Sequence, residues 1–389
     1  MKILWLPGWY PNKLGPFDGD FVQRHAKAVS MLHAVEVIFV KKDEEGKITN
    51  DIIEEVNVEQ NLTERFIYYH AARTGISLID KFISHQKYKR VYKKALKKYL
   101  KLNGKPDFVH NYIVMKAGLM ALWLKKKYNI PYIISEQWTG YLNEAKPNIN
   151  TFNFIMKGWW QKTFANAKEV MVVSKVLGEA IGKRFNVKEY TVIPNVVNTD
   201  IFFPKEKASS GVTKFVHVSL LNYQKNFTAI AEALQKVKNK GYQFILTVYG
   251  KANDEVLQSV KENNLEREII FKKEVPQQIL VRDIQDADAM LFYSRYETFG
   301  CVVIEANACG IPVILSDLPV FREYVIDNKT GIFAKPDSTD ALAEKIIYFI
   351  ENKEKFSGEE IASYTKKHFN YLTVAQQFDA LYKKTMEQL

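Results

Sequence analysis

Cysteine is scarce in this sequence. Only two cysteines, Cys301 and Cys309, occur among 389 residues. Two thiols in so long a chain do not suggest a disulfide framework, so the sequence predicts a protein of the reducing cytoplasm. Both lie in one helical stretch, where core packing accounts for them better than chemistry does. The composition is otherwise ordinary for a globular protein, with 47% hydrophobic and 25% charged residues.

Long hydrophobic runs are also missing. The longest clean apolar run, AGLMALWL at residues 117–124, is far shorter than the roughly 18 residues that a membrane-spanning helix needs. The N-terminal stretch MKILWLPGWYP has only four apolar residues between Lys2 and Pro7. That is too short for the apolar core of a signal peptide. We therefore expect a chain that does not cross a membrane.

Acidic residues are absent from residues 81–105, which hold ten lysines and arginines. This segment concentrates an imbalance, because residues 1–199 carry 31 Lys/Arg against 18 Asp/Glu and the remainder carries 24 against 26. Three interpretations stay open: a surface helix packed on its own domain, a helix that also lies against anionic lipid headgroups, and a nucleic-acid contact. No nucleic-acid recognition motif accompanies the charge. Within the segment, an apolar stripe repeats at helical spacing: Tyr88, Val91, Tyr92, Ala95, Leu96, Tyr99 and Leu100.

Strand-like apolar runs alternate with amphipathic stretches along the whole chain, a rhythm typical of parallel sheets with helical crossovers. Two such series meet at residues 194–211, which are rich in Pro, Asn, Ser and Gly, as linkers tend to be. We predict an α/β protein with two doubly wound domains, residues 1–199 and 200–371, and a last helix at about 372–389 that packs back on the first. The predicted strands are 2–7, 35–40, 66–70, 107–112, 131–136, 169–174 and 190–195, then 214–219, 244–250, 268–273, 289–294, 312–317 and 331–335.

The stretch SRYETFGCVVIEANACG, residues 294–310, places Glu297 and Glu305 eight residues apart. Glu297 lies in a strand-to-helix turn and Glu305 about two turns into the helix, so roughly 12 Å separates them along the axis. Carboxylates that hydrolyse a glycosidic bond sit roughly 5–9.5 Å apart. The spacing therefore fits better with two carboxylates that grip opposite ends of one long ligand. The alternative is that Glu297 caps the helix and Glu305 is solvated.

Between these carboxylates a helix begins near Gly300. Its free N–H groups and positive dipole end favour an anion, and a glycine allows close approach. A sugar nucleotide, with hydroxyls at both ends and phosphates between them, has a matching layout. Further candidates lie where strands end, in the cleft where such sheets bind ligands: Gly19, Gln137, Lys225 and Gly250.

The stretch SRYETFGCVVIEANACGIPVILSD resembles the E-x7-E signature of retaining glycosyltransferases of family 4, of the bacterial cell-surface polysaccharide type. The segments WYPNKLGPFDGDFVQRHAKAV, PDFVHNY, YTVIPNVVNTDIFFP and TGIFAKPDSTDALAEKI also resemble motifs of that family, so the likeness covers nearly the whole chain. It implies the GT-B fold, in which two Rossmann-like domains face each other across a deep cleft. The first would bind the acceptor and the second the nucleotide-sugar donor.

The resemblance implies a role for each candidate residue. Lys225 would hold the donor diphosphate and stabilise charge on the leaving group. Glu297 would bind hydroxyls of the transferred sugar, and Glu305 those of the ribose. The residues expected to complete the donor site are Gly19, Asn195, Gly250, Val275, Thr298, Phe299 and Gly300. The family works without a bound metal, so the two Asp-x-Asp pairs at 18–20 and 286–288 are not taken as a metal site, and no cofactor is expected.

At two positions the chain departs from the family pattern. Leu220 stands where an arginine commonly accompanies Lys225, so one phosphate-binding cation is missing, and a lysine cannot supply the bidentate fork of an arginine. Gln137 stands where many members carry a histidine near the sugar. Glutamine can hydrogen-bond a hydroxyl or a developing positive charge, but it cannot titrate. We count Gln137 with Lys225 and Glu297 as a candidate catalytic residue.

On the acceptor side, His110 and Glu136 end two strands of the first domain and are candidate contacts. The resulting hypothesis is an enzyme that moves a hexose-type sugar from a nucleotide-sugar donor to a growing, lipid-linked glycan, at the inner face of the cytoplasmic membrane. Two alternatives stay open. One is a transferase with a soluble acceptor. The other is a non-catalytic glycan- or polyanion-binding protein, which Leu220 and Gln137 would suggest.

Overall fold

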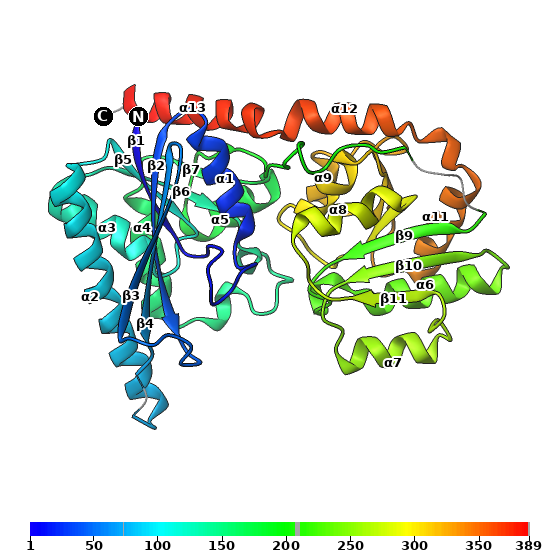
Figure 1. The fold of residues 1–389 in the computed structure, drawn as a ribbon, viewed down its shortest axis with the longest axis horizontal. Coiled ribbons are helices and arrows are strands. Elements are labelled where there is room, and N and C mark those ends of the chain that lie inside the picture. Colours follow the sequence, from blue (N-terminus) through cyan, green and yellow to red (C-terminus); the bar gives the residue numbers. More distant parts are fainter. Residues whose placement is uncertain (73, 207–210, 388–389) are drawn as a thin grey trace.

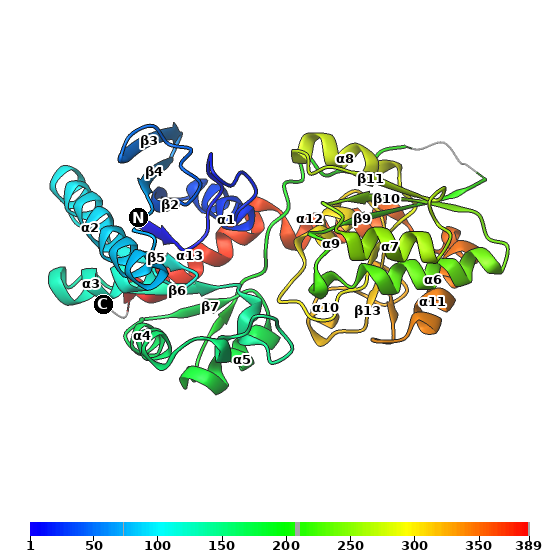
Figure 2. The same cartoon turned by 90° about the horizontal axis from the view of Figure 1, so that it is seen from below.

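The computed structural model describes residues 1–72, 74–206 and 211–387. The remaining residues include 207–210 of the predicted linker and 388–389 of the predicted last helix, which therefore lie outside the described residues. The described chain forms two lobes, each built around its own sheet, and one long helical segment spans both (Figure 1). The view from below separates the two lobes clearly (Figure 2). The predicted α/β class with two doubly wound domains is confirmed.

The first lobe contains an eight-stranded sheet in the order β3-β4-β2-β1-β5-β6-β7-β8. Its strands are β1 (Lys2–Pro7), β2 (Ala34–Asp43), β3 (Ile52–Glu59), β4 (Leu62–His70), β5 (Phe108–Tyr112), β6 (Tyr132–Glu136), β7 (Val170–Val172) and β8 (Thr191–Val192). Its helices are α1 (Asp20–Ser30), α2 (Ser77–Asn103), α3 (Gly118–Tyr128), α4 (Phe154–Ala165) and α5 (Lys175–Phe185). The central strands are almost continuously buried, as expected for parallel strands covered on both faces.

Strand β3 is the one strand of this sheet that the sequence did not reveal. It pairs antiparallel with β4 at the sheet edge, and most of its side chains are exposed. An edge strand with one neighbour and little core to fill needs no apolar pattern. Ion pairs accompany its backbone pairing with β4. Arg65 on β4 bonds to Glu54 on β3 at 2.6 Å and to Glu36 on β2 at 3.2 Å.

The second lobe contains a six-stranded parallel sheet in the order β11-β10-β9-β12-β13-β14. Its strands are β9 (Thr213–Val218), β10 (Phe244–Tyr249), β11 (Ile269–Lys272), β12 (Ala289–Phe292), β13 (Val313–Ser316) and β14 (Gly331–Ala334). Its helices are α6 (Phe227–Asn239), α7 (Asp254–Glu262), α8 (Gln277–Asp286), α9 (Cys301–Ala308), α10 (Pro319–Arg322), α11 (Thr339–Glu351) and α12 (Gly358–Phe369). All thirteen predicted strands occur, several of them shorter than predicted.

The last helix, α13 (Tyr371–Glu387), follows α12 and lies beside α1 on the first lobe (Figure 1). Alternation along β1 explains why the lobe needs it. Ile3 and Trp5 face a core completed by α1 and α13, while Leu4 and Leu6 face the core formed with α2 to α5. Phe378 of α13 packs against Trp5, with ring centroids 6.5 Å apart. The end of the chain therefore completes the core around its first strand.

Candidate active site between the lobes

Two adjoining cavities lie between the lobes. The Glu297 cavity, of about 470 Å³, is lined by Trp9, Gln137, Trp138, Lys146 and Asn195 from the first lobe and by Tyr223, Lys225, Tyr296, Glu297 and Thr298 from the second. The Glu305 cavity, of about 430 Å³, is lined by Phe17, Asp20 and Arg24 from the first lobe and by Tyr249, Val275, Leu280 and Glu305 from the second. Both cavities include Leu220, Lys225, Gly300 and Cys301. One ligand could therefore extend from one cavity into the other past these four residues.

Glu297 and Lys225 form an ion pair within the second lobe. Lys225 ends a short 3-10 turn after β9, and Glu297 lies in the loop between β12 and α9. The Lys225 ammonium bonds to Glu297 Oε1, and the Ser294 hydroxyl donates to the same oxygen at 3.0 Å. The ring of Phe292 lies 4.7 Å from the lysine nitrogen. The carboxylate is only 5% exposed, so the pair is fixed at the wall of the cavity.

Glu305 forms a second ion pair, which crosses from one lobe to the other. Arg24 on α1 approaches Glu305 Oε1 at 2.5 Å through Nη1 and Asp20 Oδ2 at 2.5 Å through Nη2. Both partners are buried, with 8% of Arg24 and 2% of Glu305 exposed. Burial raises the pKa of Glu305, and the Arg24 charge opposes that rise.

The turn that joins the two carboxylates contacts both lobes. Thr298 donates its hydroxyl hydrogen to the backbone oxygen of Gln137 at 2.9 Å, which links the turn to the first lobe. Phe299 stacks on Tyr324 with centroids 4.6 Å apart. Gly300 begins α9 with φ of 91°, a backbone conformation that favours glycine, and it lines both cavities. The helix thus presents its first N–H groups where the cavities meet.

Gln137 is held in a fixed orientation at the Glu297 cavity. Its amide nitrogen donates to Asn195 Oδ1 at 2.8 Å and to the Tyr112 hydroxyl at 2.7 Å. Both amide hydrogens are therefore used, and within residues 1–72, 74–206 and 211–387 no group donates to its Oε1. The atom left to a ligand is a hydrogen-bond acceptor.

Two predicted glycines support the site without lining either cavity. Gly19 precedes α1 with φ of 67°, and a Cβ there would lie 2.8 Å from the Trp9 backbone. Gly250 follows β10, where a Cβ would lie 2.2 Å from the Ser219 carbonyl oxygen. Each glycine lets a loop that ends at the cleft pass close to its neighbour. Val275, in contrast, lines the Glu305 cavity as expected.

His110 and Glu136, the two acceptor-side candidates, lie in the interior of the first lobe and have no exposed surface. His110 bonds to Tyr382 of α13 at 2.8 Å and to Ser135 at 2.5 Å, and burial lowers its pKa well below the usual range. Glu136 accepts hydrogen bonds from the Val114 amide at 2.7 Å and the Tyr141 hydroxyl at 2.9 Å. Burial raises the Glu136 pKa to about 7. Neither residue lines the cavities at the cleft, because His110 lies in the middle of β5 and Glu136, at the end of β6, is fully covered.

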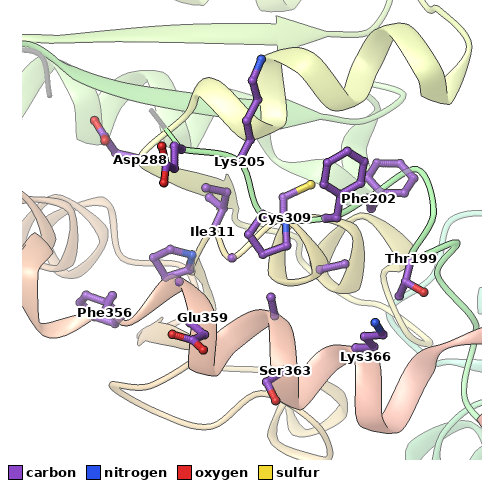
Figure 3. Close-up of a pocket in the computed structure, with 18 of the residues that line it drawn as sticks. Thr199, Phe202, Lys205, Asp288, Cys309, Ile311, Phe356, Glu359, Ser363 and Lys366 are labelled. Atoms are coloured by element: carbon purple, nitrogen blue, oxygen red, sulfur yellow. The ribbon is translucent and has the colours of Figure 1, made fainter. Parts of the chain in front are cut away.

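Two larger cavities lie outside this pair. The Trp160 cavity, of about 570 Å³, is in the first lobe, lined partly by Tyr88, Met156 and Trp160, and it shares Trp9 with the Glu297 cavity. The other, of about 680 Å³, lies between the interdomain linker and α12 (Figure 3). It contains none of the predicted site residues.

In the part of the chain that the structure describes, no group of three or more His, Cys, Asp or Glu side chains is arranged to hold a metal ion. Across the same residues, no helix has the length and apolar character that crossing a membrane requires.

Comparisons with known proteins agree with this architecture. The family model "Glycosyl transferases group 1" matches residues 198–368, and "Glycosyltransferase Family 4" matches residues 26–201. Sucrose-phosphate synthase from Thermosynechococcus elongatus has a similar structure, with a TM-score of 0.79, 20% identity and all of both chains covered. Anabaena HepE in complex with UDP and glucose gives a TM-score of 0.74 at 16% identity, covering 99% of this chain and 100% of that one.

A Bacillus subtilis (strain 168) glycosyltransferase, whose name assigns it provisionally to teichuronic acid biosynthesis, is 23% identical over 405 residues. That match covers 98% of this chain and 95% of the relative. Two lobes of this kind, each built on a doubly wound sheet, form the GT-B fold. The chain belongs to glycosyltransferase family 4, whose two models together match residues 26–201 and 198–368. It is a retaining glycosyltransferase that uses a nucleotide sugar.

Several residues at the cavities were not predicted from the sequence. Arg24 belongs to an amphipathic helix, where a charged residue reads as solvated, and only the packing of the lobes brings it to Glu305. Trp9 and Lys146 come from irregular loops, although Trp9 follows the first strand, a position that could have marked it.

Proposed function

We propose that the donor lies across both cavities at the cleft, with the transferred hexose against Glu297 and the ribose against Glu305. The diphosphate then lies between them, beside Lys225 and the first N–H groups of α9. The observation that carries this proposal is the placement of the two carboxylates on either side of one helix N-terminus, each within its own cavity. A ligand with hydroxyls at both ends and negative charge between them satisfies all of these groups.

In this proposal residues 200–371 bind the donor, and residues 1–199 together with α13 bind the acceptor. Lys225 stabilises the negative charge that develops on the departing diphosphate. A phosphate oxygen of the leaving group takes the proton from the acceptor hydroxyl on the same face of the sugar, so the anomeric configuration is retained without a protein nucleophile. Gln137 directs its Oε1 toward the positive charge that develops on the sugar.

The acceptor is proposed to be a glycan carried on a lipid. The apolar stripe of α2 that the sequence offered for lipid contact is turned inward, with Tyr92 and Leu96 fully buried. Exposed apolar side chains gather instead at the start of α2, which extends below the first sheet in Figure 1, and at the start of α4. We call these residues the apolar helix starts: Ile76, Leu78, Ile79, Phe82, Ile83, Phe154 and Ile155.

The two helix starts belong to one surface, because His85 of α2 stacks on Trp159 of α4 with centroids 5.6 Å apart. The lysine-rich remainder of α2 follows directly. Apolar residues beside a positive surface suit an anionic bilayer. The Trp160 cavity is lined by these same two helices and reaches Trp9 at the Glu297 cavity, so we assign it to the acceptor.

Two relatives support parts of the proposal. The Bacillus subtilis relative, matched along almost its whole length, is named for teichuronic acid biosynthesis, which favours a role in making a cell-surface polysaccharide. HepE is complexed with UDP, which makes UDP the first nucleotide to test.

The donor site is tested by thermal shift of the purified protein with UDP, GDP, ADP and CMP, repeated for Glu305→Ala and Lys225→Ala. We expect one nucleotide to raise the melting temperature and both substitutions to weaken its effect. Donor turnover by the wild-type protein separates an enzyme from a binding protein that kept the fold. The absence of a shift with any nucleotide would count against the donor site and favour the binding-protein alternative.

A further inference from the structure

Each of the two carboxylates at the cleft forms an ion pair, but the two cations come from different lobes. Glu297 is paired with Lys225 from its own lobe, whereas Glu305 is paired with Arg24 from the other lobe. Each carboxylate therefore has one cation as its partner, the largely covered Lys225 for Glu297 and the buried Arg24 for Glu305.

A second observation concerns the missing family arginine. Leu220, which replaces it beside Lys225, is 67% exposed. Its side chain has neither a positive charge nor a hydrogen-bond donor for a phosphate. Leu220, Lys225 and Arg24 nevertheless line the same Glu305 cavity. The only guanidinium among the described residues that line this cavity comes from α1, on the opposite side of the cleft.

We propose that Arg24 is the second phosphate-binding cation of the donor site, delivered across the cleft in place of the family arginine. The inference rests on the proposed donor site. In the structure Arg24 is paired with Glu305. When the donor binds, the ribose hydroxyls bind Glu305 and the diphosphate binds Arg24. In the same way, the sugar hydroxyls bind Glu297 and the diphosphate binds Lys225.

The exchange gives every charged group a new partner at both ends. This matters because a buried ion that loses its partner without replacement is strongly destabilising. Here each cation changes from a carboxylate to a phosphate, and each carboxylate accepts hydrogen bonds from ligand hydroxyls in place of its cation, so no buried charged group is left without a hydrogen-bond partner. Asp20, one turn earlier on α1, stays within 2.5 Å of Arg24 and keeps its side chain oriented toward the cavity.

Arginine suits this task better than lysine, because its planar fork can bind two phosphate oxygens at once. Its position also couples binding to the closed arrangement of the lobes. A diphosphate bound by Lys225 from one lobe and by Arg24 from the other bridges the cleft. The donor therefore makes both contacts only when the lobes are together.

The test compares a nucleoside diphosphate with its nucleoside, using UDP, GDP and ADP against uridine, guanosine and adenosine. Dissociation constants are measured by calorimetry for the wild-type protein, Arg24→Gln, Arg24→Lys and the double variant Arg24→Gln/Leu220→Arg. We expect Arg24→Gln to weaken the diphosphate about 10–100-fold, the range for a hydrogen bond to a charged group, and to change nucleoside affinity much less. Arg24→Lys should fall between the two. The added arginine at position 220 should restore most of the diphosphate affinity.

Lys27→Gln is the matched control, since it removes a positive charge from the same helix, one turn away, where the side chain is 41% exposed. It should leave both affinities unchanged. If the wild-type protein binds a diphosphate and Arg24→Gln changes diphosphate and nucleoside affinity by the same factor, or tightens both, Arg24 is only a partner of Glu305 and the inference is wrong. If the wild-type protein binds none of the six ligands, the donor site itself fails and the inference fails with it.

Discussion

The first lobe and the second lobe repeat one architecture, a wholly or mainly parallel sheet between helical layers, but they differ in where they place charge and apolar surface. Residues 1–199 have 31 Lys/Arg against 18 Asp/Glu, and they expose the apolar helix starts. The remainder has 24 against 26 and places Glu297 and Glu305 at the cleft. The backbone plan alone therefore does not assign tasks to the lobes, and the side chains at strand ends and helix starts do.

A buried carboxylate in each lobe sharpens this comparison. Glu305 in the second lobe has Arg24 as its partner, whereas Glu136 in the first lobe has hydrogen-bond donors and, among the residues that the structure describes, no ion-pair partner. Burial raises the pKa of both carboxyl groups, but the Arg24 charge opposes that rise only at Glu305. Substitutions in the two lobes should therefore change different properties. In the first lobe these are the stability of the core, the ionisation of Glu136 and the binding of lipid, and in the second lobe the turnover of the donor.

The largest effect is expected from Phe378→Ala, which removes a fully buried ring from α13 where it packs against Trp5. The free energy of unfolding should fall by about 3–5 kcal/mol, because the lost ring leaves a cavity in the core of the first lobe. Urea denaturation followed by tryptophan fluorescence measures this, since Trp5 lies in that core. Leu372→Ala on the same helix is the control, since Leu372 is 46% exposed. Equal losses for both variants would show that α13 does not complete this core.

The second prediction concerns Glu136, whose folded pKa is about 7 because burial disfavours its charge. The ordinary value is 4.5, so the folded protein binds a proton that the unfolded chain releases between these values. Stability is therefore lost as the pH rises from about 4.5 to 7. Glu136→Gln removes this loss and should be more stable than the wild type by about 3 kcal/mol at pH 8, with little difference at pH 4.5.

Urea midpoints measured from pH 4.5 to 8 follow the effect. The exposed residue Glu144 offers a control substitution, Glu144→Gln, which should reproduce the wild-type curve. A Glu136→Gln curve parallel to the wild type would contradict the assignment.

Much of the fold and part of the site could be predicted, and the division follows from the range of the interactions involved. The strands of both sheets carry their own apolar pattern, and Glu297, Lys225 and Gly300 follow strand ends, so local sequence located them. Strand β3 was missed because most of its side chains are exposed, so its sequence carries no apolar pattern that would predict a strand. Arg24 and the burial of His110 were missed for another reason, because contacts between lobes, or with a helix 272 residues away, leave no local signal.

The third prediction tests the chemistry of the second lobe. Glu297→Gln keeps the size of the side chain but removes the charge that pairs with Lys225 and that, in the proposed site, binds the sugar hydroxyls. Turnover of the donor should fall about 100-fold, the cost of losing hydrogen bonds to a charged group. Binding of the nucleoside diphosphate should change little, because in the proposed site the nucleotide end of the donor lies against Glu305. Unchanged turnover would remove Glu297 from the reaction, whereas a comparable loss of nucleotide binding would place it at the wrong end of the donor.

The smallest effect is expected at the surface of the first lobe. Phe82 is 64% exposed and Phe154 is 82% exposed, so replacing both by aspartate removes apolar contact without disturbing a core. Binding to vesicles of phosphatidylglycerol and phosphatidylcholine should weaken at least about tenfold, since each ring loses part of the 1.5–3 kcal/mol that full burial contributes and each new charge repels the anionic surface. Sedimentation at low and moderate salt measures the bound fraction.

The control for this surface comes from the other lobe. Leu257 on α7 is also half exposed, and Leu257→Asp should leave vesicle binding unchanged, while all three substitutions should leave nucleotide binding unchanged. An equal loss for the control would mean that the whole protein, and not the apolar helix starts, meets the lipid. If the wild-type protein stays in solution even at low salt, the acceptor is a soluble glycan. The positive charge of the first lobe then faces water, and the two lobes differ in their ligands alone.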